Sequence, residues 1–437
     1  MNLINKNKIL IIGAGISGIS CANRLLTLNP NYDITIFEAS DRYGGRLKTL
    51  NNFASYGIEL GGEEIHGRKS EYYNLVNQVG GKTFGYWDEN LLYTIYKGEW
   101  CSLEESKIEE VKRVSDLFEE VSYELNKDYE DETLRSYLDK NSFAKDSYYL
   151  ANAMFGVEAG TDLDKVSIGG FSQVNKNWEA GGENFLLQNM THMDVIEKAY
   201  AKVITKIKLN SPITAIDYTN NQIKLIDSNQ NEYIGDKCIL SVPITQLKNN
   251  KINLIPTLPE DQLKAINSIK IDNCAKLILK LKKQFWPNNT GWLLLEGNVN
   301  LYWPTSQGKT SDDIILSALV TGQGCDNLQA LYKESKETFI ECIIIELERG
   351  FKLTDMKDNI IDYHWHNWAT IPFIEGGYSY PSVGEGDSRA IGGKSIENKL
   401  FFAGEAFAKN GHIATIHGAM ERGIDVANEI HEGINSN

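Results

Sequence analysis

The stretch KILIIGAGISG, residues 8–18, decides the fold of this chain. Its first five residues form a mostly apolar run, which is typical of a parallel strand buried on both faces. The glycine-rich turn follows at once and opens a helical stretch that closes at Asn29-Pro30. Residues 33–37 alternate into a second strand. The sequence therefore predicts a strand–helix–strand unit in which the first amides of the helix face a pyrophosphate.

A glycine-rich turn alone is weak evidence for a nucleotide site, because such turns are common. Glu38 strengthens the evidence, since it follows the second strand about 20 residues after the turn, where a carboxylate holds ribose hydroxyls. The alternative is a structural turn followed by a surface glutamate. The preceding strand, the following helix and Glu38 together favour dinucleotide binding.

The composition is that of a soluble globular protein. The 437 residues are 42% hydrophobic and 24% charged, which is enough for two closely connected domains. The formal net charge of −15 would repel nucleic acid and attract polycations. Six scattered cysteines form no CxxC pair, and no metal-ligand spacing is visible, so no metal is expected. Without a signal peptide or an apolar run of about 18 residues, we expect a cytoplasmic protein that does not enter a membrane.

The rest of the chain alternates between helical and strand-like segments. Apolar residues at helical spacing from 108 to 125 predict an amphipathic helix. Residues 205–242 have the pattern of short strands and turns, and a strand at 314–320, a helix at 336–347 and a strand at 360–365 are predicted further on. No linker separates these segments, so the domains are expected to interleave.

Two further motifs narrow the cofactor. EASDRYGGR, residues 38–46, resembles the EAxxRxGGR signature of the flavin amine oxidase superfamily, and LFFAGE, residues 400–405, matches its carboxy-terminal FAD motif. Arg46 can neutralise phosphate charge, and a last helix beginning near residues 414–416 would point its dipole at the flavin. The resemblance implies bound FAD and these contact residues: Gly13, Gly15, Ser17, Gly18, Glu38, Ala39, Gly44, Gly45, Arg46, Gly61, Gly62, Glu63, Ile213, Trp368, Gly404, Glu405, Thr415 and Ile416.

The same resemblance implies the fold. The amine oxidase fold is α/β, with a Rossmann-like FAD-binding domain interleaved with a mixed α+β substrate domain. We place the FAD-binding domain at residues 1–72, 200–265 and 375–437, and the substrate-binding domain at residues 73–199 and 266–374.

A lysine is predicted at the reacting end. The polyamine oxidase and lysine demethylase branch of the superfamily is resembled almost element by element in four segments, residues 236–243, 258–259, 273–281 and 285–287. Lys276 falls where this branch keeps a buried lysine near flavin N5. The neighbouring lysines at 280, 282 and 283 would by themselves suggest a solvated strand face, so only the resemblance selects Lys276.

Aromatic residues form a second block. WATIPF, residues 368–373, and GGYSY, residues 376–380, resemble the family's WxxxPFxxGxYSY segment. The resemblance implies that Trp368 lies against the flavin and that Tyr380 lines the substrate channel; the alternative is a pair of core aromatics. Ser379 stands where monoamine oxidases carry the cysteine that bonds to flavin, so we predict non-covalent FAD. Thr415 replaces a cage tyrosine of monoamine oxidases, so a closed cage for aryl amines is not expected.

The loop ELGGEEIHG, residues 59–67, resembles the family's ELGAxWIHG segment. His66 matches a substrate-contacting histidine, and Glu64 replaces the usual tryptophan. A glutamate there would repel a carboxylate and attract a second cationic nitrogen; the alternative is a solvent-facing acid. The predicted catalytic residues are Lys276, Tyr380, His66 and Thr415, and the predicted substrate-binding residues are Glu64, His66 and Tyr380.

These residues predict an FAD-dependent amine oxidase. We expect it to convert a primary or secondary amine, foremost a polyamine, into an imine and to release hydrogen peroxide. Its partners would be the small amine and molecular oxygen, without nucleic acid or membrane, in a monomer or homodimer. The alternatives are an L-amino acid oxidase, which Glu64 argues against, a flavin desaturase or protoporphyrinogen-type oxidase, which would lack the Lys276 and Trp368 blocks, and an FAD-binding protein without turnover.

Overall fold

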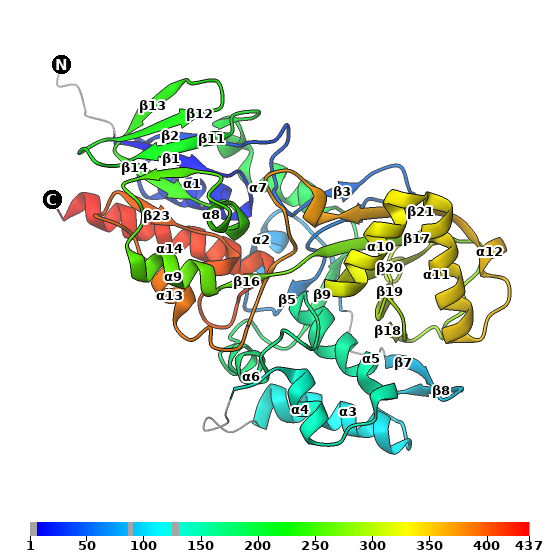
Figure 1. Cartoon of the computed structure of the whole chain (residues 1–437). Helices are drawn as coiled ribbons and strands as arrows, with labels where there is room; N and C mark the ends of the chain where they lie inside the picture. Colours follow the sequence, from blue (N-terminus) through cyan, green and yellow to red (C-terminus); the bar gives the residue numbers. More distant parts are fainter. Residues whose placement is uncertain (1–6, 86–90, 125–130, 437) are drawn as a thin grey trace.

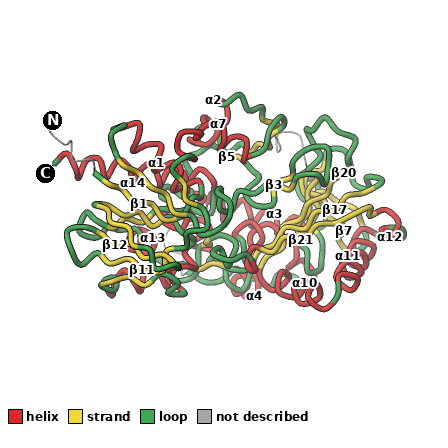
Figure 2. The backbone as a smooth tube through the Cα atoms, turned by 90° about the horizontal axis from the view of Figure 1, so that it is seen from above, coloured by secondary structure: helices red, strands yellow, loops and turns green. Residues whose placement is uncertain are grey.

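The computed structural model describes residues 7–85, 91–124 and 131–436, which build two lobes (Figure 1). One lobe contains a five-stranded parallel sheet and the other a seven-stranded mixed sheet, and Figure 2 shows the two sheets at opposite ends of the molecule. Residues 1–6 of the predicted first domain and Leu125 of the predicted amphipathic helix lie outside the described residues.

The five-stranded sheet is assembled from distant parts of the chain. Its order is β10-β2-β1-β14-β23, and all four pairings are parallel. Apolar side chains on both faces explain why these strands are buried, since Ile9 and Ile11 point into one core and Leu10 and Ile12 into another. The strands are β1 (Lys8–Ile12), β2 (Asp33–Phe37), β10 (Ile207–Lys208), β14 (Lys237–Leu240) and β23 (Leu400–Phe402).

Helices cover one face of this sheet and a small second sheet covers the other. Helices α1 (Ile16–Leu28) and α14 (Ile416–Asn435) pack together on the first face, so the two ends of the chain lie side by side (Figure 1). The second face carries the sheet β13-β12-β11-β15. These strands and the short helices nearby are β11 (Ile213–Asp217), β12 (Ile223–Asp227), β13 (Glu232–Gly235), β15 (Asn253–Ile255), α8 (Ile244–Lys248), α9 (Glu260–Ser268) and α13 (Ser388–Gly392).

The seven-stranded sheet forms the second lobe in the order β21-β17-β20-β19-β18-β7-β8. Helices α10 (Gly322–Glu334) and α11 (Lys336–Phe351) cover its outer face, with α12 (Met356–Asn359) at the edge. The inner face turns toward the nucleotide lobe. The strands are β7 (Leu91–Tyr96), β8 (Glu99–Ser102), β17 (Cys274–Leu281), β18 (Thr290–Leu294), β19 (Leu301–Pro304), β20 (Ile314–Thr321) and β21 (Ile360–Asn367).

A group of helices packs beside the inner edge of this sheet. The predicted amphipathic helix appears as α3 (Glu109–Glu119) continued by a π-helical turn. Val111, Val114 and Val121 are buried as the spacing indicated, whereas Phe118 is half-buried and its neighbour Leu117 is buried. The other members are η1 (Glu120–Glu124), α4 (Leu134–Lys140), η2 (Lys145–Ser147), α5 (Tyr148–Ala151), η3 (Asn152–Val157) and α6 (Ile168–Lys176).

Short elements connect the lobes, and two of the predicted domain limits fall inside helices. The boundary predicted at 72 falls inside α2 (Glu71–Gln78), and the one at 200 falls inside α7 (His192–Ile204). Both helices place apolar residues in the core beneath α1, so they pack as part of the nucleotide lobe. The remaining elements are β3 (Thr49–Leu50), β4 (Ile58–Glu59), β5 (Ile65–His66), β6 (Thr83–Gly85), β9 (Asn184–Leu187), β16 (Lys270–Ile271), η4 (Trp368–Thr370), β22 (Ser379–Tyr380) and η5 (Glu405–Phe407).

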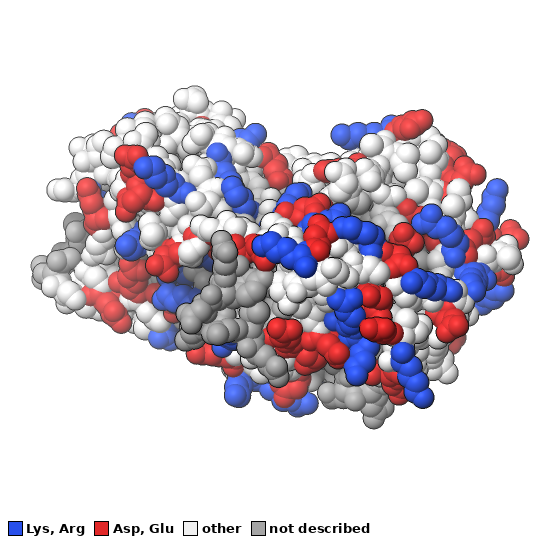
Figure 3. Space-filling model, turned by 60° about the horizontal axis from the view of Figure 1, so that its bottom comes forward, with Lys and Arg blue, Asp and Glu red and all other residues white. Residues whose placement is uncertain are grey.

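The surface carries charges of both signs. On the face shown in Figure 3, acidic and basic side chains are interspersed. Among the described residues, no helix is long and apolar enough to cross a membrane.

Candidate functional site

The glycine-rich turn is packed so closely that only glycine fits at two positions. Gly13 has φ +102°, and a Cβ there would lie 2.9 Å from the carbonyl oxygen of Ser241. A Cβ on Gly18 would overlap the carbonyl of Gly13. At Gly15, by contrast, no atom lies within 4 Å of where a Cβ would be. The turn is therefore tight on its protein side and open beside Gly15, as close approach of a pyrophosphate requires.

The start of α1 has polar groups that the protein does not use. Gly15 is the N-cap and supplies no side-chain hydrogen bond. The hydroxyl of Ser17 is buried and has no hydrogen-bond partner among the described residues. Buried polar groups are nearly always bonded, so an unpartnered hydroxyl next to uncapped helix amides fits a phosphate ligand.

Glu38 ties the second strand to the glycine-rich turn. Its carboxylate accepts hydrogen bonds from the amide of Ala14 at 2.9 Å and from the amide and hydroxyl of Ser40 at 2.9 and 2.8 Å. Ala39, which lies between Glu38 and Ser40 in the sequence, is half-buried. The main chain of Glu38 also binds that of Ser211, two residues before the buried Ile213. These contacts hold Glu38 at the end of β2, where a ribose would lie.

The loop after Glu38 crosses the same turn. The amide of Gly44 donates to the carbonyl of Ala14 at 2.8 Å, and a Cβ on Gly45 would lie 3.2 Å from Gly15 Cα. Arg42, which was not among the predicted residues, holds this loop by donating to the carbonyls of Gly45 and Leu47. Its place in the signature EASDRYGGR could have indicated this role.

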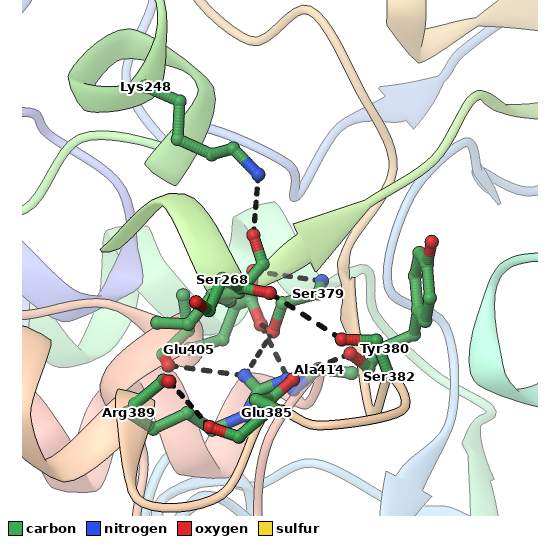
Figure 4. Close-up of polar contacts among 12 residues, drawn as sticks. Lys248, Ser268, Ser379, Tyr380, Ser382, Glu385, Arg389, Glu405 and Ala414 are labelled. Atoms are coloured by element: carbon green, nitrogen blue, oxygen red, sulfur yellow. Dashed lines mark hydrogen bonds and ion pairs between the residues drawn. The ribbon is translucent and has the colours of Figure 1, made fainter. Parts of the chain in front are cut away.

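Arg46 and Glu405 join the two ends of the chain. Arg46 donates to Glu405 Oε1 at 2.9 Å and to the carbonyl of Gly377 at 2.7 Å. The other oxygen of Glu405 accepts from the Ser379 hydroxyl at 2.6 Å and from the Ala414 amide at 3.1 Å (Figure 4). Burial opposes ionisation, but Arg46, Ser379 and Arg389 outweigh it and lower the pKa of Glu405. Glu405, which follows Gly404, is thus an ionised anchor for the cofactor end of α14.

Ser379 is fully used by this network. Its hydroxyl donates to Glu405 and accepts from Arg389 at 2.7 Å, and Arg389 in turn pairs with Glu385 (Figure 4). Ser379 is completely buried. Ser379 therefore has a structural role in the Glu405 cluster.

Trp368 packs against the loop that precedes β5. Its indole donates to the carbonyl of Leu60 at 2.9 Å, and its ring closes one side of Gly61, where a Cβ would also overlap the carbonyl of Arg46. The next glycine, Gly62, has Ile416 on its other side, with side-chain carbons 3.0 Å from where a Cβ would lie. These contacts bring Gly61, Gly62, Trp368 and the start of α14 together.

Thr415 caps the last helix. Its hydroxyl accepts from the Gly418 amide at 2.9 Å and donates to the carbonyl of His412 at 2.8 Å. Both hydrogen-bonding functions of the hydroxyl are occupied in this arrangement. Thr415 therefore orients the helix start, and the amide of Ile416 next to it remains directed out of the helix.

Lys276 lies at the inner face of the seven-stranded sheet. It is the one charged residue of β17 that is buried, and it faces Leu319 and His366 of the neighbouring strands. Its ammonium forms an ion pair with Glu63 at 2.5 Å, in which the side chains are 3% and 9% exposed. The ring of Trp303 lies 4.4 Å from the ammonium nitrogen. Sequence reasoning placed Glu63 with the cofactor and did not foresee this pair or Trp303.

A hydrogen-bonded group lies behind the ion pair. His192 meets the carbonyl of Glu63 through Nε2 at 3.0 Å and the hydroxyl of Tyr72 through Nδ1 at 2.7 Å. Glu59 accepts from the amide of His192 at 2.9 Å and from the hydroxyl of Thr49 at 3.2 Å. Burial raises the pKa of Glu59 to about 8 and lowers the pKa of His192 to about 4. Both groups are therefore mainly uncharged near neutral pH.

His66 and Glu64 face the same region from β5 and the loop before it. The Nδ1 atom of His66 lies 2.6 Å from the Asn184 amide oxygen and 4.0 Å from Glu64. Because an amide oxygen only accepts, Nδ1 carries the proton and Nε2 is left as an acceptor. Burial lowers the pKa of His66, and Asn184 opposes this. Burial, with the charge of Glu63 adding to it, raises the pKa of Glu64 to about 7.

The structure adds Glu158 and Tyr378 to this region. The side chain of Glu158 reaches the surface. Its pKa is nevertheless raised to about 8, first by burial among the surrounding protein atoms and then by the charge of Glu64. Tyr378 donates from its hydroxyl to the carbonyls of Val157 and Glu158 at 3.0 and 3.1 Å. Burial raises the pKa of Tyr378 well above its usual value, and Cys274, Glu158 and Glu64 contribute.

Tyr380 is not brought to this group. It is 6% exposed, its ring packs in the core of the helical region, and its hydroxyl meets Thr161. Tyr378 precedes β22, whereas Tyr380 lies within it and pairs with Lys270 of β16. The tyrosine beside Glu64 is therefore Tyr378, two residues before the one that sequence reasoning selected.

His412, His417 and Glu421 form the one group of three possible metal ligands within the described ranges, all within 4.8 Å of one another. His412 is already bonded through both nitrogens, to Glu421 at 2.7 Å and to the amide of Glu179 at 3.3 Å. Both imidazole nitrogens of His412 are therefore already satisfied by the protein.

Comparison with known proteins identifies the family. The family model described as flavin containing amine oxidoreductase matches residues 16–431. The chain belongs to this family of flavin amine oxidoreductases. It is therefore an FAD-dependent oxidoreductase that acts on amines, and the open glycine turn, the unpartnered Ser17 hydroxyl and Glu38 fit the adenosine and pyrophosphate parts of that cofactor.

Curated relatives of this flavin amine oxidoreductase include oxidases and demethylases. The chain is 26% identical to polyamine oxidase 5 of Oryza sativa subsp. japonica, covering 96% of the chain and 87% of that protein. It is 24% identical to lysine-specific histone demethylase 1 homolog 3 of Arabidopsis thaliana and 25% identical to lysine-specific histone demethylase 2 of Homo sapiens. These alignments cover 97% and 98% of the chain, but the chain spans only 30% and 53% of those proteins.

Solved structures share the whole fold. Putrescine oxidase bound to putrescine superimposes with a TM-score of 0.83 at 17% identity, over 99% of both chains. Cyclohexylamine oxidase from Brevibacterium oxydans IH-35A superimposes with a TM-score of 0.80 at 17% identity, over 98% of this chain and 100% of that one. The predicted fold class, an amine oxidase fold of interleaved α/β and α+β parts, is confirmed.

Proposed function

We propose that this flavin amine oxidoreductase oxidises a polycationic amine, foremost a polyamine, to an imine and releases hydrogen peroxide. The observation that carries the proposal is Glu64, a carboxyl group that faces the region between the two lobes near Lys276. Glu64 lies near enough to Glu158 for its negative charge to raise the pKa of Glu158. Two carboxyl groups beside each other suit a ligand with two ammonium groups.

The residues divide into those that hold the cofactor and those that face the amine. Ser17, Glu38, Arg46 and the amides at the start of α1 and α14 would hold FAD without a covalent bond. The bound flavin would supply the oxidant for the carbon–hydrogen bond next to nitrogen. On the amine side, Nε2 of His66 would accept from a substrate ammonium, and Tyr378, in place of Tyr380, would line the channel. Lys276 would stand at the reacting end of the flavin.

An L-amino acid oxidase is disfavoured by the same carboxyl groups. A substrate carboxylate would meet Glu64 and Glu158, and among the described residues that face this region no arginine stands beside them. Ionised Glu64 repels a substrate carboxylate and protonated Glu158 offers it no counter-charge, so amino acids are expected to reduce the flavin poorly. We further propose that the protein works in the cytoplasm, where its six cysteines, all unpaired, stay reduced.

Kinetics of the E64Q variant test the proposal. We expect the KM for spermidine to rise at least about tenfold while kcat for a simple monoamine stays close to that of the wild type, because only a second ammonium needs the carboxylate. The matched control is E232Q, which removes an acid that is paired with Lys224 at the surface of β13. If E64Q and E232Q change the spermidine KM equally, Glu64 does not bind the substrate.

A further inference from the structure

The ion pair between Lys276 and Glu63 is unusual for its burial. Most ion pairs of the described residues include a side chain that is more than a quarter exposed, whereas these side chains are 3% and 9% exposed. A buried charge without a counter-charge is costly, and removing one partner of a buried pair leaves the other uncompensated. Each member of this pair therefore sets the charge of the other.

We propose that Glu63 is a positioning residue, whose carboxylate supplies the counter-charge of Lys276 and holds its ammonium at the reacting edge of the flavin. The placement of the flavin edge rests on the proposed function. The pairing itself does not, because it is made by side chains of this chain alone. Glu63 thus has a task other than direct cofactor contact.

The main chain of Glu63 is fixed from behind. A carbonyl oxygen only accepts hydrogen bonds, so Nε2 of His192 carries the proton and donates to Glu63, and Nδ1 then accepts from Tyr72. The low pKa of His192, about 4 because of burial, keeps this tautomer uncharged. Trp303 lies on the ammonium at 4.4 Å and limits its movement. The main chain of Glu63 and the ammonium of Lys276 are therefore each held by a second contact.

The groups around the pair show where the negative charge resides. Burial and then the charge of Glu63 raise the pKa of Glu64, and the same charge adds to the raised pKa of Glu59. Of these three carboxyl groups, Glu63 is the one paired with a cation. Its charge makes ionisation of Glu59 and Glu64 less favourable. The titratable groups that face Lys276 or Glu63 are Glu59, Glu64, His192, Cys274, Lys309, Tyr56 and His366, which lies opposite Lys276 on β21.

A double-mutant cycle on the apoprotein tests the pairing without any turnover. We expect E63Q and K276M each to lower the urea midpoint of unfolding, and the double variant to regain most of that loss, because neither charge is then left alone. The matched control is the pair Lys280–Asp313, four residues along the same strand, at 2.7 Å with side chains 26% and 19% exposed. K280M and D313N should show a smaller coupling. Additive losses from E63Q and K276M would overturn the pairing.

The pH profile of the holoenzyme tests the positioning role. In E63Q we expect the alkaline limb of the flavin reduction rate to move to lower pH by about 1–3 units, because the ammonium has lost its counter-charge. E63D should restore most of the shift, and D313N should leave the profile unchanged. If no amine reduces the flavin, the proposed function fails, and the pH dependence of the flavin potential in E63Q is measured instead. A profile or potential identical to that of the wild type would overturn the role of Glu63.

Discussion

Glu59 is a buried carboxyl group whose protonated form the fold prefers. Its pKa of about 8 lies above the ordinary value of 4.5, chiefly because of burial. The folded protein therefore binds more protons than the unfolded chain between these two values. The contribution of Glu59 to the free energy of unfolding is therefore greatest below about pH 4.5 and is lost as the pH rises toward 8.

The apoprotein of E59Q should show this directly. Since glutamine does not titrate, we expect the midpoint of thermal unfolding to fall less between pH 5 and 8 than it does in the wild type. A matched series of melting curves at constant ionic strength measures the two slopes. Equal slopes would mean that Glu59 is ionised in the folded protein.

Glu64 should make ligand affinity depend on pH in the opposite sense. Its pKa of about 7 means that the free site becomes negatively charged as pH rises through neutrality, while alkyl ammonium groups with pKa values of about 10 remain charged. The dissociation constant of a diamine should therefore decrease between pH 6 and 8, and E64Q should abolish most of this decrease. Calorimetric titration at each pH checks it, and a pH-independent wild type would contradict it.

Among elements, the start of α1 sets the strictest steric condition. A Cβ on Gly18 would overlap the carbonyl of Gly13, so G18A should push the helix away from the turn. We expect it to weaken FAD binding by at least about fivefold, for a cost of about 1–3 kcal/mol. Fluorescence titration of the apoprotein with FAD measures this. The control is G182A, since nothing lies within 4 Å of a Cβ there. Equal affinity in both variants would show that the turn can relax.

The cap of α14 is a second test at this scale. T415A removes the acceptor for the Gly418 amide and should cost about 0.5–2 kcal/mol of stability, while T415S retains the hydroxyl and should lose less. Chemical denaturation of the apoprotein distinguishes them. If T415S is as unstable as T415A, the methyl group rather than the cap matters.

Elements with local signals were predictable from the sequence. Apolar runs and helical spacing predicted the strand at 8–12, the helix after it, and the segments found as β20, α11 and β21. Partners that are distant in sequence were not predictable. Glu63 and Lys276 are 213 residues apart, and periodicity cannot show that a loop carboxylate meets a strand lysine. Tyr378 and Tyr380 also look alike in sequence, and only the contacts of their hydroxyl groups in the folded chain distinguish them.

For the whole molecule, the interleaving follows from which strands share a sheet. β1, β14 and β23 are neighbours in the sheet although long stretches of chain separate them, so a division by sequence position is necessarily approximate. The helices at 71–78 and 192–204 illustrate this, because their apolar faces rather than their positions assign them to the nucleotide lobe. The motifs at residues 38–46 and 400–405 predicted one shared cofactor site. In the folded chain, Arg46 of the first motif binds Glu405 of the second.

Anaerobic reduction of the bound flavin by a panel of amines tests the central proposal most directly. Purified holoenzyme would be mixed without oxygen with spermine, spermidine, putrescine, an aryl amine or an L-amino acid, and the flavin absorbance followed. We predict fast bleaching by the polyamines, slower bleaching by the aryl amine and little by amino acids, with hydrogen peroxide formed when air is admitted. Bleaching by L-amino acids in preference to polyamines, or by none of these compounds, would contradict the account.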